Sequence, residues 1–230
     1  MTMEQLKVSC RAFNGIATDG YLPLDSILAD VWMREHFPNL YYHNSVGAKD
    51  NFIDAELPLL KIDNGHGWYY ACSFVEVEWV ANEMVHWHKR HTGYEQRRYI
   101  GSGKINLSQG ATKAYRMPLF TLHAGSRLTW YLVGERKWLL DRLSFINAIG
   151  KKHNSGRGIV CDWKIERMIE DYSIWKGDRL MRAIPIDDVP KDRTGLIYRV
   201  GHYGLRPAYW YSPYQMNLAM PIMEAAPDGP

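Results

Sequence analysis

The sequence RLTWYLVGERKWLLDRLSFINAIG, residues 127–150, carries the clearest secondary-structure pattern in this chain of 230 residues. Residues 127–133 favour a strand, which Gly134 closes. In residues 135–149 the side chains of Leu139, Leu143 and Ile146 recur at helical spacing, so we expect an amphipathic helix that Gly150 ends. The segment therefore predicts a strand that leads directly into a helix.

Three further segments alternate between apolar and polar side chains and are predicted to be strands: residues 6–13, residues 68–80, and residues 159–166. In the last of these, Ile159, Cys161, Trp163 and Ile165 are expected on one side. A helix is predicted from a cap at Asp25 or Ser26 to about residue 36, before Pro38. Its expected inner face consists of Ile27, Leu28, Val31 and Trp32.

The predicted order of elements is βαββαβ, which is typical of the ferredoxin-like, RRM-like α+β fold. Residues 81–126 are basic and interrupted by glycines, so we expect an insert between the second and third strands of this core. We predict a domain over residues 1–170 that contains this insert. Residues 171–230 are predicted to be a C-terminal extension that packs on the core.

Composition indicates a folded chain with a sizeable core, because 46% of the residues are hydrophobic and 13% are aromatic. The N-terminus has no apolar signal segment, and no apolar run reaches membrane-spanning length, so a cytoplasmic location is expected. The three cysteines, Cys10, Cys72 and Cys161, form no CxxC pair. We therefore expect them to be reduced and buried.

Charge is distributed unevenly along the chain, although the net charge is only +3. Residues 85–157 hold 14 Lys plus Arg and three acidic residues, a local balance of +11, whereas the remainder has a balance of −8. Five of the nine histidines also lie in this basic stretch. Such segregation favours binding to a polyanion, and nucleic acid is the first candidate.

The loop between the predicted last helix and last strand combines glycines with cations. Glycine lets the backbone approach a phosphate closely, and cations neutralise the phosphate. A purely structural turn would explain Gly150, but it would not explain the cluster of polar and cationic residues that follows. The predicted RNA contacts in this loop are Gly150, Lys151, Lys152, His153, Asn154, Ser155, Gly156, Arg157 and Gly158.

A second cluster of cations lies in the predicted insert, where Trp87, Tyr94 and Tyr99 interleave with it. This mixture suits stacking of unpaired bases along a charged backbone. The histidines at 86, 88 and 91 are also spaced so that they could hold a metal, but no carboxylate or cysteine nearby completes a ligand set, and no metal or cofactor is predicted. The predicted RNA contacts here are His88, Lys89, Arg90, His91, Arg97, Arg98, Lys104, Lys113 and Arg116.

Several stretches resemble the RAMP superfamily of CRISPR-associated proteins, and more closely the Cas-five-type subunit of type IV effector complexes. They are the opening strand with Leu24-Asp-Ser-Ile-Leu, Gly110-Ala-Thr-Lys-Ala-Tyr, Gly150 to Gly158 with Trp163, Leu180-Met-Arg-Ala-Ile-Pro185, and Leu205-Arg-Pro-Ala-Tyr-Trp210. The resemblance spans residues 6–210. It implies a RAMP core in which residues 150–158 are the family's glycine loop and residues 81–118 are a thumb-like insert.

The resemblance also implies a function in antiviral defence. Such a subunit grips the five-prime handle of the CRISPR RNA and caps the filament of Cas-seven-type backbone subunits, next to a large subunit and with at most indirect contact to target DNA. Some relatives are metal-free endoribonucleases, and this alternative stays open, although spacing nominates no catalytic residue among the histidines. A protein–protein adaptor that uses its aromatic C-terminal region is a third alternative.

Overall fold

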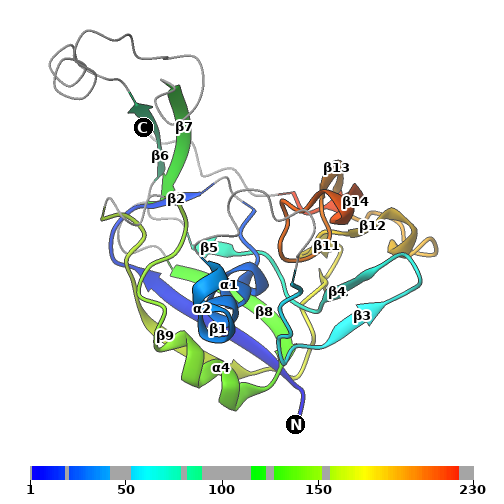
Figure 1. The fold of residues 1–230 in the computed structure, drawn as a ribbon. Helices are drawn as coiled ribbons and strands as arrows, with labels where there is room; N and C mark the ends of the chain where they lie inside the picture. The colour runs from blue at the N-terminus through cyan, green and yellow to red at the C-terminus, as the bar shows by residue number, and fades with distance from the viewer. Residues whose placement is uncertain are drawn as a thin grey trace, which may run out of the picture.

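The computed structural model describes residues 2–18, 21–41, 53–78, 82–89, 115–122, 127–151 and 156–222. Its centre is a four-stranded antiparallel sheet in the order β5-β8-β1-β9 (Figure 1). The bounds of these strands are Glu4–Ala12 for β1, Glu76–Glu78 for β5, Arg127–Gly134 for β8 and Val160–Arg167 for β9. The predicted strands at residues 6–13, 127–133 and 159–166 are therefore confirmed, and the chain is a mixed α+β protein.

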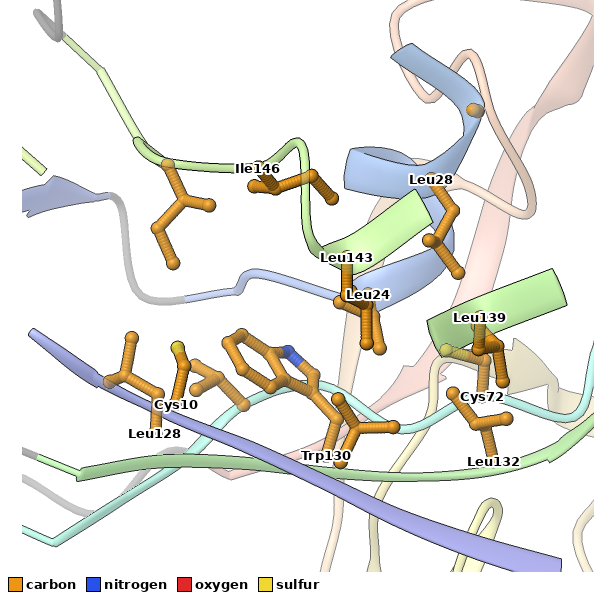
Figure 2. Close-up of a cluster of buried hydrophobic side chains, with 14 of the residues drawn as sticks. Cys10, Leu24, Leu28, Cys72, Leu128, Trp130, Leu132, Leu139, Leu143 and Ile146 are labelled. Carbon is orange, nitrogen blue, oxygen red and sulfur yellow. The ribbon is translucent and has the colours of Figure 1, made fainter. Parts of the chain in front are cut away.

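The helices α1 (Leu24–His36) and α4 (Arg136–Leu143) pack on one face of this sheet, and a short helix, α2 (Pro38–Tyr41), follows α1. Figure 2 shows Trp130 of β8 beneath Leu24 of α1 and Leu143 of α4. The indole of Trp130 is fully buried, and its Nε1 donates a hydrogen bond to the carbonyl of Leu22 at 2.9 Å. Burial of this apolar layer is the main stabilising contribution to the sheet.

The second predicted helix is shorter than expected, because α4 ends at Leu143 and not at residue 149. The following residues pair with the start of β9 instead. The N–H of Val160 donates to the carbonyl of Asn147 at 3.0 Å, and Ala148 bridges Ile159. Backbone groups that make these bonds cannot also continue a helix. Gly150 therefore lies in the loop and does not cap the helix.

The strand predicted over residues 68–80 is two short strands. Residues Trp68–Tyr70 form β4, which pairs with β3 (Lys61–Asp63), and β5 joins the central sheet further along. Between them, four backbone amides in residues 71–75 donate to carbonyls from separate parts of the chain, namely Leu60, Tyr131, Met181 and Leu22. The side chains from 70 to 75 are all buried, so this alternating pattern reflects a segment enclosed on both sides.

The predicted cap of α1 is wrong. Pro23 occupies the N-cap position, and the Ser26 hydroxyl donates back to the Pro23 carbonyl at 2.7 Å. Asp25 is fully buried and forms an ion pair with Arg182. The predicted inner face is confirmed, since Leu28 is buried and Ile27, Val31 and Trp32 pack against the same core.

A separate antiparallel sheet, β2-β7-β6, rises from the end of β1. Its strands are β2 (Ile16–Thr18), β6 (Asn82–Lys89) and β7 (Tyr115–Leu122). In Figure 1 the ribbon formed by β6 and β7 extends away from the central sheet. Both of these long strands belong to the predicted basic insert.

The C-terminal region forms a second cluster of buried side chains with Tyr131 of β8 and with Tyr21 and Phe74, which lie outside the strands of the central sheet. Its strands β12, β14 and β13 make a three-stranded sheet, and β10 and β11 form a two-stranded one. The elements of this region are β10 (Trp175–Lys176), β11 (Arg179–Leu180), β12 (Ile184–Pro185), η3 (Ile186–Asp188), β13 (Arg199–Gly204), η4 (Ser212–Tyr214) and β14 (Gln215–Met220).

The three cysteines are free, as expected. Cys10 and Cys72 are buried, whereas Cys161 is only half-buried. Within the described part of the chain, no helix is long and apolar enough to cross a membrane.

Candidate nucleic-acid interface

The glycine loop, residues 150–158, is held at its base by Asn14, which follows the end of β1. The Asn14 side-chain amide donates to the carbonyl of Gly156, and its Oδ1 accepts a hydrogen bond from the N–H of Ile159 at 2.8 Å. One side chain therefore contacts both the loop and the residue that leads into β9. The neighbouring Gly15 carbonyl accepts a further bond from the N–H of Gly158 at 3.0 Å.

The glycines of this loop adopt backbone conformations that favour glycine. Gly150, Gly156 and Gly158 have φ values of 83°, 77° and 78°, all in the left-handed region. A Cβ on Gly158 would lie 2.0 Å from the carbonyl oxygen of Ile149. The Gly158 carbonyl also accepts a bond from the N–H of Ile149 at 2.9 Å, so this residue closes the loop through close backbone contact.

The described polar residues of the loop lie on the surface. Lys151 and Gly156 are exposed and Arg157 is half-buried. Lys152, His153, Asn154 and Ser155 lie outside the described residues. Because hydrogen bonds hold both described ends of the loop, Lys151 and Arg157 can meet a phosphate there with little further ordering of the backbone at these ends.

The second predicted cluster lies in the ribbon. Backbone pairing places His88 of β6 opposite Arg116 of β7, and Lys89 opposite Tyr115. Three of the predicted contacts thus lie at backbone positions near the far end of the paired part of the ribbon. The remaining ones, Arg90, His91, Arg97, Arg98, Lys104 and Lys113, lie outside the described residues.

A single short segment connects the loop with the ribbon. Asn14 and Gly15 bind the glycine loop, and the next residue, Ile16, begins β2 and pairs with Leu122 of β7. The glycine loop and the base of the ribbon therefore share one short backbone connection. In Figure 1 the end of β1 lies on the side of the sheet from which the ribbon rises.

A β-bulge in β9 brings Asp162 beside Arg11 of β1 at this end of the sheet. The register between β1 and β9 shifts between Ser9 and Arg11, and Asp162 has a left-handed φ of 58°. Its carboxylate pairs with Arg11, Nη2 to Oδ2 3.0 Å. The predicted alternation of β9 is therefore only partly right. Trp163 and Ile165 pack on the core, whereas Ile159, on the other side of the bulge, is 41% exposed.

Sequence reasoning missed Arg11, Phe13 and Asn14. The alternation of residues 6–13 does contain part of the signal, since positions 7, 9, 11 and 13 must share one face of a strand. An Asn-Gly pair directly after a strand also marks a tight turn. The contact between Asn14 and Gly156 spans more than 140 positions, and local pattern carries no information on it.

Among the residues that the structure describes, no group of three or more His, Cys, Asp or Glu side chains is arranged to hold a metal ion. Of the three histidines considered as metal ligands, His86 and His88 lie on β6, and His91 is outside the described residues. No protein-family model matches the chain, and no curated protein matches it.

Proposed function

We propose that this chain is an RNA-binding structural subunit of a type IV CRISPR ribonucleoprotein, which grips the five-prime handle of the CRISPR RNA. The observation that carries the proposal is the connection through residues 13–18. Asn14 and Gly15 hold the glycine loop while Ile16–Thr18 pair with the ribbon. The glycine loop and the base of the cation-rich ribbon, which are far apart in the sequence, are thus joined at one end of the sheet, and in this proposal the RNA backbone runs from the loop along the ribbon.

We also propose that the central sheet is a ferredoxin-like RAMP core with a thumb-like insert. Numbered along the chain, its strands are β1, β5, β8 and β9, with α1 after the first strand and α4 after the third. The spatial order β9-β1-β8-β5 then corresponds to 4-1-3-2, with all neighbours antiparallel. This spatial order of the strands supports a split βαβ arrangement.

In the proposed complex this subunit caps the filament of Cas-seven-type backbone subunits and lies beside the large subunit. Its role there is binding and not cleavage. Incubating the purified protein with CRISPR repeat RNA in EDTA tests this part directly, because metal-free RNA cleavage needs only a base and a proton donor. Intact RNA is expected, and discrete products would favour the endoribonuclease alternative.

Handle binding is tested with labelled CRISPR repeat RNA and a triple variant, Lys151→Ser, Lys152→Ser and Arg157→Ser. Removing three phosphate contacts should weaken binding and reduce the slope of log K against log salt by up to about three. A matched control changes three exposed cations away from the loop, Lys137→Ser, Lys191→Ser and Arg199→Ser. Equal affinities for the two variants would contradict the proposal.

A further inference from the structure

An exposed apolar pair lies beside the glycine loop. The Phe13 side chain is 65% exposed and that of Ile159 is 41% exposed. The N–H of Phe13 donates to the carbonyl of Ile159 at 2.8 Å, so the two residues are cross-strand neighbours at the end of β1. Neighbours of this kind present their side chains on the same face of the sheet. The pair therefore forms a small apolar surface that is exposed to solvent.

Two arginines lie directly opposite each other on the same face of the sheet. Arg11 of β1 pairs in register with Arg127 of β8, and their side chains are 54% and 56% exposed. Like charges directly opposite on adjacent strands destabilise a sheet. Each guanidinium has an acidic neighbour, Asp162 at 3.0 Å for Arg11 and Glu78 at 3.7 Å for Arg127. A bound anion between the two arginines would offset their repulsion further.

The spacing of these groups matches a nucleotide. Phe13 follows Arg11 by two positions, just beyond the end of β1, and two residues of extended chain span about 7 Å. An unpaired nucleotide presents a flat base and a neighbouring phosphate within a comparable distance. Aromatic side chains stack on unpaired bases while arginines neutralise the phosphates next to them. An apolar protein segment would match Phe13 and Ile159 but not the opposed arginines.

We propose that this end of the sheet face is a nucleotide-binding position. Phe13 stacks on one unpaired base of a single-stranded RNA, and Arg11 and Arg127 bind the adjoining phosphate. The inference rests on the proposed RNA-binding function and names where one base is held. Asn14 fixes this position relative to the glycine loop, because it follows Phe13 directly and binds Gly156 and Ile159.

The test compares Phe13→Leu with Phe13→Trp in fluorescence anisotropy with labelled CRISPR repeat RNA. Leucine keeps the apolar bulk but has no aromatic face, so we expect a loss of affinity of roughly fivefold to 150-fold. Tryptophan should bind at least as tightly as the original phenylalanine. Phe145→Leu is the matched control, because Phe145 is 73% exposed but lies in the turn after α4. Circular dichroism and thermal unfolding establish that each variant is folded.

A second arm replaces single nucleotides of the RNA by abasic sites. At one position the loss caused by Phe13→Leu should disappear, because the base on which Phe13 stacks is then absent. The Arg11→Gln and Arg127→Gln variants should lower the salt slope by about one each, whereas Phe13→Leu should leave the slope unchanged.

The outcomes separate this inference from the proposed function. If Phe13→Leu binds like the unmodified protein while the triple loop variant binds weakly, the nucleotide position is wrong and RNA binding stands. If the unmodified protein binds no repeat RNA, both fail. If Phe13→Leu loses only its association with other effector subunits, the apolar pair is a protein contact and the inference is overturned.

Discussion

Asp25 and Arg182 form a fully buried ion pair, with Arg182 Nη1 2.8 Å from Asp25 Oδ2. The pair joins the first turn of α1 to the C-terminal region. The Tyr209 hydroxyl donates to Asp25 Oδ1 at 2.7 Å, and Arg182 Nη2 donates to the Leu205 carbonyl at 3.0 Å. Burial raises the pKa of the Asp25 carboxyl, and the adjacent Arg182 guanidinium opposes this by favouring the ionised form.

Replacing Arg182 by methionine should lower the free energy of unfolding by about 3–5 kcal/mol, since it leaves the Asp25 carboxylate buried without its partner. Arg193→Met is the control. Arg193 pairs with Asp178 at 2.9 Å, but both side chains are substantially exposed, so its loss should cost less than about 1 kcal/mol. Urea unfolding followed by tryptophan fluorescence measures both. Similar costs for the two variants would show that the buried pair is not a major link.

The glycine loop offers a matched pair of substitutions. Gly156→Ala should cost about 1–2 kcal/mol, because alanine is strained at a φ of 77° and, in the described part of the structure, nothing lies within 4 Å of the added methyl group. Gly158→Ala has the same backbone strain and also a methyl group 2.0 Å from the Ile149 carbonyl oxygen. It should cost roughly 1–3 kcal/mol more. Chemical denaturation of both variants tests this order, which a reversed ranking would contradict.

Asp162 provides a test of backbone strain at the bulge. Both Asp162→Gly and Asp162→Ala remove the exposed ion pair with Arg11, but only glycine accepts a φ of 58° without steric cost. The glycine variant should therefore be more stable than the alanine variant by about 1 kcal/mol. Thermal unfolding compares them. Equal stability would mean that the bulge relaxes when the carboxylate is removed.

Stability should fall at alkaline pH because of the two buried thiols. Burial raises the pKa of Cys10 and of Cys72 in the folded protein. Above about pH 8.5 the unfolded chain loses thiol protons that the folded chain retains, so the free energy of unfolding decreases as pH rises. The slope should approach about 1.4 kcal/mol per pH unit for each thiol.

The double variant Cys10→Ala, Cys72→Ala serves as the comparison for this pH effect. It should lack the part of the slope that begins near the ordinary thiol pKa, whatever its stability at neutral pH. Urea unfolding at a series of pH values measures both slopes. An unchanged slope in the double variant would exclude the thiols as the cause.

Local patterns were sufficient for the elements that have one solvent-facing side. Strands β1 and β9 and helix α1 were predicted from alternation or helical spacing, because partial burial imposes a period on the side chains. Strand β8 is buried from Leu128 to Gly134 and was recognised without such a period. The pattern was misleading over residues 68–80. There both sides are buried, and four separate parts of the chain supply the backbone partners.

The glycine loop was recognised from its residue types, since glycines and cations are local properties of a sequence. The residue that anchors the loop, Asn14, was not recognised, because its hydrogen bonds to Gly156 and Ile159 join segments that only the sheet brings together. The same holds for Arg182 with Asp25, and for Arg11 opposite Arg127. Residue type defines the chemistry that a segment offers. Strand pairing decides which segments combine their chemistry, because it is stabilised by burial and hydrogen bonds across the whole chain.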